Sequence, residues 1–224
     1  MLVVKGGELF LQQGGSGAPG PVTVDFGSGA LHYRRRDTTP ELLGKAVGRA
    51  AHRPLRILDA TAGLGTDAFV LAGLGHEVMM CERDAVIAEL LRHALDVARG
   101  RGDARLSEVV ERLSLIPLDA RECDGERLQG VDVIYLDPMF PGRTKSAAVK
   151  KEMALLQRLL ADASSAQDSD VLLHWALQQG AARVVVKRPV KADNLASLEP
   201  SHRIVGKAVR YDVYARRKLA WRAE

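Results

Sequence analysis

From residue 55 onward, short apolar runs alternate with longer amphipathic stretches. The short runs predict strands at 55–60, 77–82, 113–120, 131–138 and 182–189. The stretches between them predict helices at 67–75, 84–100, 146–160 and 170–180. Strands that are separated by helices pair in parallel, so the pattern predicts an α/β fold with a doubly wound, mostly parallel sheet.

The two ends of the chain depart from this alternation. Residues 202–217 predict two strands joined at Gly206 and Lys207, which gives the sheet an antiparallel finish. Short β-like pieces lie between Gly, Pro and Ser turns at 8–13, 22–26 and 30–34, and Pro40 opens a helix predicted over 40–51. We therefore expect a small N-terminal β appendage, residues 1–39, and one α/β domain, residues 40–224.

Composition narrows the class of protein. A chain of 224 residues with 46% hydrophobic content suits one domain, and it contains no apolar run near 18 residues, so we expect no membrane span. The N-terminal sequence "MLVVKGGELF" lacks the apolar core of a signal peptide. Cys81 and Cys123 have no metal-type spacing and the His residues form no cluster, so we expect a reducing cytoplasm and no metal site.

The charge balance is mildly basic. The net charge is +4 and the pI about 9.2, with basic runs at 34–36, 150–151 and 187–191 and near the C-terminus. Such a balance favours a polyanionic partner, although many basic proteins bind no nucleic acid. The position of the basic runs relative to a site therefore matters more than the net charge.

The first strand of the alternation ends in a Gly-rich turn, "DATAGLGTD", at 59–67. Ligands of open α/β sheets lie beyond the carboxyl ends of the strands. Gly63 and Gly65 allow a sharp bend and a close approach of a ligand, and the following helix offers unpaired N–H groups. G-x-G alone also occurs in plain tight turns, and Ala68 at the third position of a dinucleotide fingerprint decides nothing.

Acidic residues follow the next two strands and sharpen this interpretation. Glu82 lies 17 residues beyond Gly65, where a carboxylate can accept hydrogen bonds from ribose hydroxyls, and Asp119 can face an adenine amine. Either acid alone is equally well a solvated loop carboxylate, but together they predict a nucleoside pocket. Asp59 and Asp67 bracket the first turn and can accept the ammonium of S-adenosyl-L-methionine (SAM), whereas NAD carries a pyrophosphate; Asp59 can also cap the turn.

The fourth strand ends in "DPMF", residues 137–140, where the reacting end of a cofactor would lie. An exocyclic base amine is a poor nucleophile because its lone pair is delocalised into the ring. Hydrogen-bond acceptors on both N–H groups favour a pyramidal nitrogen, and Asp137 and the carbonyl of Pro138 can supply them. Phe140 can stack on an unpaired base. The competing interpretation is a strand-end turn with a buried Phe.

Basic residues follow this motif and the fifth strand. Next to a base pocket they can contact phosphates, although a solvated helix face is the ordinary alternative. The candidates for RNA contact are Arg143, Lys145, Lys150, Lys151, Lys187 and Arg188.

Together these stretches resemble the RsmJ family of 16S rRNA (guanine(1516)-N(2))-methyltransferases. The resemblance rests on "DATAGLGTDAFVLA", "CERD", "VIYLDPMFPGRTKSAAVKKEM", "RVVVKRP" and "GKAVRYDVY" and spans about residues 20–215. It implies a class I, Rossmann-like methyltransferase domain that uses SAM, releases S-adenosyl-L-homocysteine and modifies 16S rRNA or the small ribosomal subunit. It implies cofactor contacts at Thr66, Asp67, Glu82, Arg83, Asp119, Ala120 and Asp137.

"DPMF" resembles the D/N-P-P-Y/F/W signature of amino-methyltransferases, from which Met139 departs at the second proline. The residues leave other activities open, including methylation of tRNA or of adenine N6 in DNA. A small-molecule methyltransferase, a non-catalytic ribosome-assembly protein that binds RNA and a dehydrogenase fit the residues less well. The sequence leaves the oligomeric state open.

Overall fold

The computed structural model describes residues 1–224 apart from 16–17, 19, 29–38, 51–52, 139–165 and 220–224. Two predicted elements, the β-like piece at 30–34 and the helix at 146–160, lie outside the described residues. Among the helices that the described residues form, none combines the length and apolar character needed to cross a membrane.

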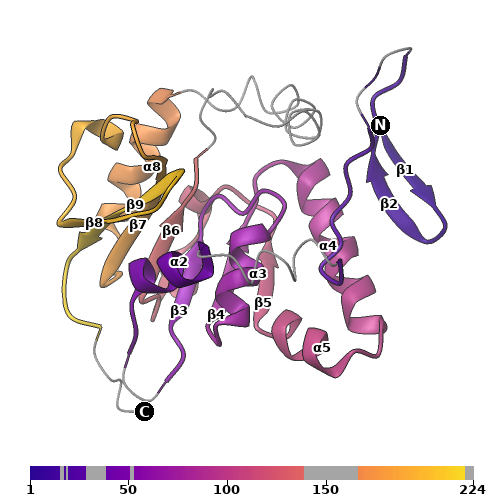
Figure 1. The fold of residues 1–224 in the computed structure, drawn as a ribbon, viewed down its shortest axis with the longest axis horizontal. Helices are drawn as coiled ribbons and strands as arrows, with labels where there is room; N and C mark the ends of the chain where they lie inside the picture. The colour runs from indigo at the N-terminus through magenta and orange to yellow at the C-terminus, as the bar shows by residue number, and fades with distance from the viewer. Residues whose placement is uncertain (16–17, 19, 29–38, 51–52, 139–165, 220–224) are drawn as a thin grey trace.

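A seven-stranded sheet forms the centre of the molecule (Figure 1). Five strands pair in parallel, and the last two run antiparallel, as the sequence predicted. In spatial order the strands are β5 (Leu113–Ile116), β4 (Glu77–Cys81), β3 (Arg56–Asp59), β6 (Val133–Leu136), β7 (Arg183–Pro189), β9 (Val209–Ala215) and β8 (His202–Val205).

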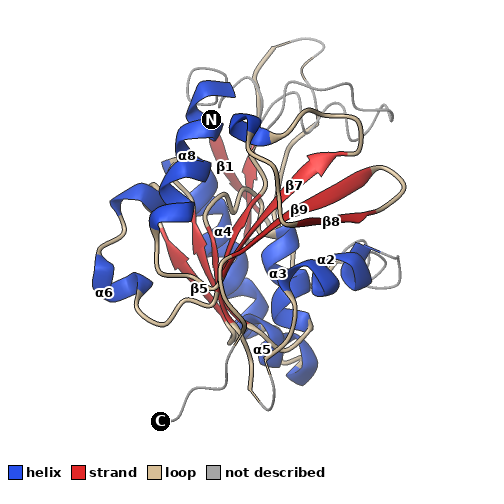
Figure 2. Ribbon diagram, turned by 90° about the vertical axis from the view of Figure 1, so that its left-hand side faces the viewer, coloured by secondary structure: helices blue, strands red, loops and turns tan. Residues whose placement is uncertain are grey.

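Helices cover both faces of the sheet, which Figure 2 shows edge-on. One face packs against α2 (Thr39–Val47), α3 (Thr66–Gly73), α4 (Ala85–Gly100) and α5 (Ala104–Val110). The opposite face packs against α8 (Ala166–Gln178), α6 (Gly125–Leu128) and the short 3-10 helices η1 (Ala120–Glu122) and η2 (Leu195–Ser197). Because strand side chains alternate between faces, each strand contributes to both hydrophobic cores.

Local sequence explains most helix boundaries. The side chain of Asp84 caps α4 by accepting from the backbone N–H groups of Val86 and Ile87. Helix α2 stops at Val47, short of the predicted end, and Gly48 follows with φ +82°. Three elements went unpredicted, α5, η1 and α6, because pieces of 3 to 7 residues are too short to show a helical period.

The N-terminal segment forms a hairpin and then joins the main core. Strands β1 (Leu2–Lys5) and β2 (Glu8–Leu11) pair antiparallel across Gly6 and Gly7, both at positive φ, and β1 was not predicted. The predicted strand at 22–26 is reduced to one bridge between Leu11 and Val22. Phe26 is fully buried and its ring stacks on Phe69 of α3 at 5.2 Å. The domain boundary at residue 39 stays a prediction.

The chain order places a crevice at one edge of the sheet. From β3 the chain builds outward through β4 and β5, then returns to β6 beside β3 and builds the other way. Ligands of open α/β sheets bind beyond the carboxyl ends of the strands at such a reversal. The ends of β3 and β6 therefore define the place to search for a site.

Candidate active site

The Gly-rich turn after β3 wraps closely against its neighbours. The backbone N–H of Ala62 donates to the Cys81 carbonyl at 3.0 Å. Gly65 precedes α3 with φ +71°, and a Cβ atom there would lie 2.9 Å from the Leu91 side chain. Gly63 has φ +53°, but a Cβ atom there would meet only the Thr61 carbonyl oxygen, at 4.0 Å. Gly65 thus serves packing, whereas Gly63 leaves open space on its outer side.

Glu82 secures this turn from the end of β4. Its Oε2 accepts from the backbone N–H of Gly63 at 2.8 Å, and its Oε1 accepts from that of Asp84 at 2.8 Å. Burial raises the pKa of Glu82 above its usual value, against the effect of these two donors. Each oxygen retains a further lone pair, so the carboxylate is fixed and still able to accept from a ligand hydroxyl.

Asp119, after β5, is held by arginines. Arg121 donates to its two oxygens, from Nε at 2.9 Å and from an Nη at 2.6 Å, and this contact lowers the pKa of Asp119. Arg121 and Arg83 both reach Asp168 of α8 at 2.8 Å, and Arg83 lies 3.6 Å from Asp119. Neither Arg121 nor Asp168 was predicted from the sequence. The neighbouring Ala120 is buried.

Four polar side chains meet where β6 and β7 end, and we call them the acid–lysine cluster: Asp67, Tyr135, Asp137 and Lys187. The Lys187 ammonium donates to Asp67 Oδ2 at 2.6 Å and to Asp137 Oδ2 at 2.9 Å. The Tyr135 hydroxyl also donates to Asp67 Oδ2, at 2.6 Å. α3, β6 and β7 thus each contribute to one ion-paired group, as does the residue after β6.

Asp137 remains accessible within this cluster. Its backbone N–H donates to Thr61 Oγ1 at 2.6 Å, and 38% of its side chain is exposed. Loss of water still raises the pKa of Asp137 above its usual value; the Lys187 ammonium counters that rise and Asp67 adds to it. For Lys187, burial would lower the pKa, but the two carboxylates outweigh it and raise that pKa.

Asp59 lies beneath the cluster at the end of β3. It is 2% exposed and accepts from the backbone N–H of Thr61 at 3.1 Å. Burial raises the pKa of Asp59 well above its usual range, and nearby acids, including Asp67 and Asp137, add to that rise. The region therefore holds more carboxylates than cations.

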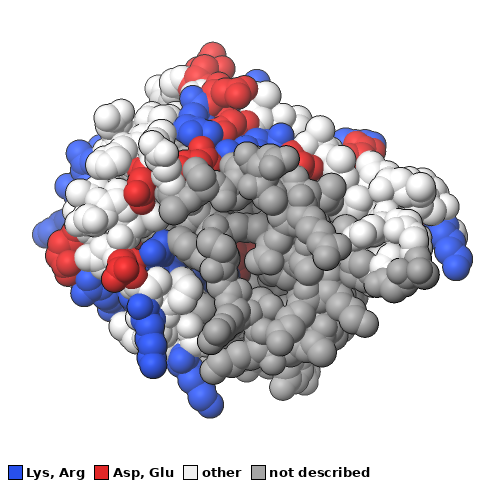
Figure 3. Space-filling view, turned by 90° about the horizontal axis from the view of Figure 1, so that it is seen from above, with Lys and Arg blue, Asp and Glu red and all other residues white. Residues whose placement is uncertain are grey.

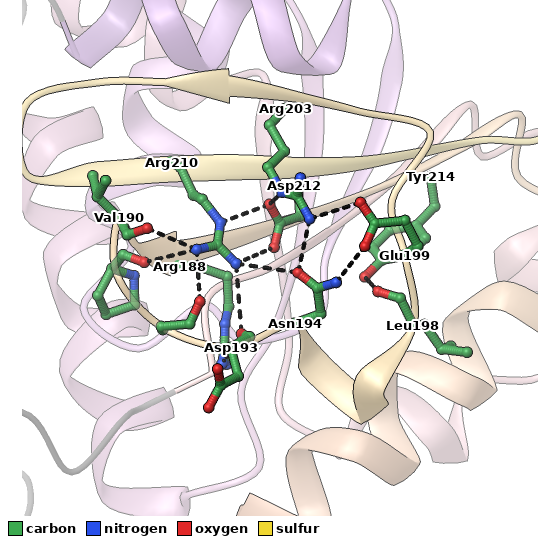
Figure 4. A network of polar contacts seen from close by, with 12 residues as sticks. Arg188, Val190, Asp193, Asn194, Leu198, Glu199, Arg203, Arg210, Asp212 and Tyr214 are labelled. Carbon is green, nitrogen blue, oxygen red and sulfur yellow. Dashed lines mark hydrogen bonds and ion pairs between the residues drawn. The ribbon is translucent and has the colours of Figure 1, made fainter.

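Lys187 and Arg188 do not lie on the surface that their basic run suggested. Lys187 points into the acid–lysine cluster, with 20% of its side chain exposed. Arg188 points to the opposite face of the sheet, is 7% exposed and donates to the Asp193 carbonyl at 2.7 Å (Figure 4). Both positions are explained by contacts within the chain, so RNA contact by these two residues stays a prediction without structural support.

The rest of the predicted substrate surface is only partly described. Pro138 is buried, whereas Met139 and the remaining candidates lie outside the described residues: Phe140, Arg143, Lys145, Lys150 and Lys151. Figure 3 looks down on the edge of the sheet, and Lys and Arg side chains project along its left-hand part, on the side of β7, β8 and β9. Within the described residues, no group of three His, Cys, Asp or Glu side chains is suited to hold a metal ion.

Comparisons with known proteins identify the family. The family model described as SAM-dependent methyltransferase matches residues 1–216. Proteins named ribosomal RNA small subunit methyltransferase J, from Cellvibrio japonicus and Thioalkalivibrio sulfidiphilus, are each 45% identical to this chain, covering 98% and 96% of it and 84% of each relative. The chain belongs to this methyltransferase family.

A solved structure supports the same assignment for the fold. The methyltransferase resembles a SAM-dependent methyltransferase from Neisseria gonorrhoeae, with a TM-score of 0.74 and 38% identity over 96% of this chain and 81% of that one. The class I fold and the SAM cofactor that the sequence predicted are thereby confirmed.

The chemistry of the crevice fits this cofactor. SAM carries a sulfonium and an ammonium, and the excess of carboxylates around Asp59 and Asp137 favours a cationic ligand over the pyrophosphate of NAD. The open side of Gly63 allows close approach of a ligand. The Tyr211 hydroxyl, buried and influenced by the charges of Asp67 and Lys187, has no hydrogen-bond partner within the described residues. It is therefore available to a ligand that enters the site.

Proposed function

We propose that this methyltransferase transfers the methyl group of SAM to the exocyclic N2 amine of guanine 1516 in 16S rRNA. The observation that carries the proposal is the Asp137 carboxylate, held yet exposed at the end of β6 and followed by Pro138. The names of the 45%-identical relatives support small-subunit rRNA as the substrate. The choice of atom and nucleotide rests on the resemblance to the RsmJ family.

Asp137 is the acceptor that prepares the amine. Its Oδ2 is bonded to Lys187, whereas no contact engages Oδ1 within the described part of the chain. Oδ1 accepts one amine N–H and the Pro138 carbonyl accepts the other, which turns the nitrogen lone pair out of conjugation with the ring. Bound SAM supplies an electrophilic methyl group on its sulfonium. After transfer the nitrogen releases one proton, which the Asp137 carboxylate can take.

Other residues hold the reactants. Glu82 accepts the ribose hydroxyls of the cofactor and Asp119 faces its adenine, with Thr66, Arg83 and Ala120 beside them. Asp59, Asp67 and the turn at Gly63 and Gly65 receive its amino-acid end. Phe140 stacks on the target guanine, and Arg143, Lys145, Lys150 and Lys151 contact RNA phosphates.

The test uses SAM labelled in its methyl group. The protein is incubated with 16S rRNA and with small subunits from cells that lack this gene, and the labelled nucleoside is identified by digestion and mass spectrometry. We expect N2-methylguanosine at one site, in at least one of the two substrates. Label on adenine, or on tRNA or DNA instead, would keep the methyltransferase and discard the proposed target.

A further inference from the structure

Lys187 occupies an unusual position for a residue in a basic run. Its ammonium lies between two carboxylates, Asp67 and Asp137, whose side chains are 12% and 38% exposed. The more buried of the two, Asp67, also accepts the Tyr135 hydroxyl. One cation thus joins a buried anchor to the exposed acid that faces the substrate.

The charge balance of the cluster depends on this lysine. The groups that face it come from four elements: Asp59 of β3, Asp67 of α3, Tyr135 of β6 with Asp137 just after it, and Tyr211 of β9. Three of them are acids and none is a cation. Two carboxylates that share a site disfavour ionisation of both, so removal of Lys187 would leave Asp67 and Asp137 to compete for one proton.

The geometry assigns orientation as well as charge to Lys187. Its contact at Oδ2 fixes one end of the Asp137 carboxylate, and Thr61 Oγ1 fixes the backbone N–H of the same residue. With both points held, the rotation of the side chain is restricted and Oδ1 keeps one direction. A catalytic acceptor gains from such preorganisation, because no reordering is needed during the reaction.

We propose that Lys187 is a positioning residue for methyl transfer: it keeps the Asp137 carboxylate ionised and oriented toward the target amine. The proposal rests on the acceptor role that the proposed function gives to Asp137. It replaces the contact with RNA phosphate that the basic run "KRPVK" suggested.

The sign of the expected pH effect follows from the charges. Only ionised Asp137 accepts an N–H, so kcat falls at low pH as this group takes up a proton. Loss of the Lys187 cation raises the pKa of Asp137 further, which moves the acid limb of the kcat profile to higher pH. A lysine that bound RNA would instead change KM and its salt dependence.

The first measurement compares pH profiles of kcat and KM for the wild type, Lys187→Met and Lys187→Arg. For Lys187→Met we expect the acid limb to rise by about one pH unit or more. At neutral pH its kcat should fall by about tenfold to a hundredfold, with KM for SAM and RNA changed by less than about threefold. Lys187→Arg keeps the cation and should keep the limb. The matched control is Lys45→Met, an exposed lysine paired with Glu41 on α2, which should leave the profile unchanged.

The second measurement needs no activity. Carbon-13 NMR of labelled aspartate carboxyls gives the titration of Asp137 directly, assigned by its absence from Asp137→Asn. Its midpoint should rise in Lys187→Met and stay near the wild-type value in Lys187→Arg. If Lys187→Met does not fold, the double variant Asp67→Asn with Lys187→Met removes one acid with the cation. In that variant the midpoint should return toward the wild-type value.

The outcomes separate this inference from the proposed function. An unchanged Asp137 midpoint in folded Lys187→Met overturns the inference, whatever the substrate is. The same holds for a loss of activity confined to KM. A wild-type enzyme that does not methylate guanine N2 overturns the proposed function, while a higher midpoint in Lys187→Met would still establish that Lys187 controls the ionisation of Asp137.

Discussion

Two networks of buried charge lie on opposite faces of the same two strands. On one face of β7 and β9, Lys187 enters the acid–lysine cluster. On the other, Arg188 lies beside a second network, the Arg210–Asp212 network, which also contains Asn194, Glu199 and Arg203 (Figure 4). The two networks differ in how completely their charges are matched.

The Arg210–Asp212 network is closed. Arg210 donates to both oxygens of the fully buried Asp212, at 2.8 and 3.0 Å, and to the carbonyls of Val190 and Ala192 at 2.8 and 2.6 Å. These contacts fix the loop after β7. The acid–lysine cluster has two acids for one cation, and part of Asp137 is exposed. A matched network stabilises the fold, whereas an unmatched and accessible one is able to receive a ligand.

The largest effect is expected for Asp137→Ala. This change removes the acceptor but leaves Lys187 paired with Asp67. We expect kcat to fall by about a thousandfold or more, because an electrostatic contact made in the transition state is lost. The free energy of unfolding should change by less than about 1 kcal/mol, and binding of SAM, measured by calorimetry, should change little. Activity near the wild-type level would discard the acceptor role.

The opposite outcome is expected for Asp212→Asn in the closed network. This change leaves the Arg210 cation buried without its carboxylate, which costs about 3–5 kcal/mol in the free energy of unfolding. The kcat of the folded enzyme should stay within about threefold of the wild type, since the residue lies on the face away from Lys187. Urea unfolding and steady-state kinetics measure the two quantities.

A double variant sharpens this test. Arg210→Met with Asp212→Leu removes both charges, and apolar replacement of a buried ion pair is often close to neutral. Here we expect only partial recovery of stability, because the carbonyls of Val190 and Ala192 lose their donor. Full recovery would show that the loop contacts contribute little.

The sequence predicted the framework better than the contacts of the site. Strand and helix alternation predicted the parallel sheet, and the acids at strand ends predicted where Glu82, Asp119 and Asp137 would lie. The sequence also contained a signal that we did not use. Lys187 and Arg188 are neighbours in a strand, so they point to opposite faces and cannot form one basic surface.

Other contacts had no local signal. Arg121 and Asp168 are 47 residues apart and meet only because α8 packs beside η1. Which face of β7 would carry the acids depended on the packing of α3, which places Asp67 against Tyr135. Such choices are made by tertiary packing and cannot be deduced from the pattern of one segment.

A smaller effect tests whether the crevice stores unfavourable charge. The raised pKa of Asp59 means that its ionisation in the folded state is unfavourable. Its contribution to stability is present below the unfolded pKa, about 4, and is lost as pH rises through the folded pKa. Asp59→Asn should therefore gain stability relative to the wild type as pH rises. The gain should be about 1.4 kcal/mol for each pH unit that separates the folded pKa from the unfolded pKa.

Urea unfolding at about pH 5 and about pH 8 measures this difference, with and without SAM. The gain should be larger at the higher pH. Bound SAM should reduce it, because a cationic ligand stabilises the ionised carboxylate of the wild type. An equal gain at both pH values would show that Asp59 ionises without cost in the folded protein.

The smallest effect is expected at the solvent side of the closed network. Arg203 is 36% exposed; it lies 3.4 Å from Asp212 and donates to Glu199 and Asn194, each at 2.9 Å. Exposed ion pairs contribute about 0.2–1 kcal/mol and are screened by salt, so Arg203→Met should cost about that much in the free energy of unfolding. Urea unfolding at low and high salt should show the cost decreasing with salt. A cost as large as that of Asp212→Asn would mean that the network is organised around Arg203 rather than around the buried Arg210–Asp212 pair.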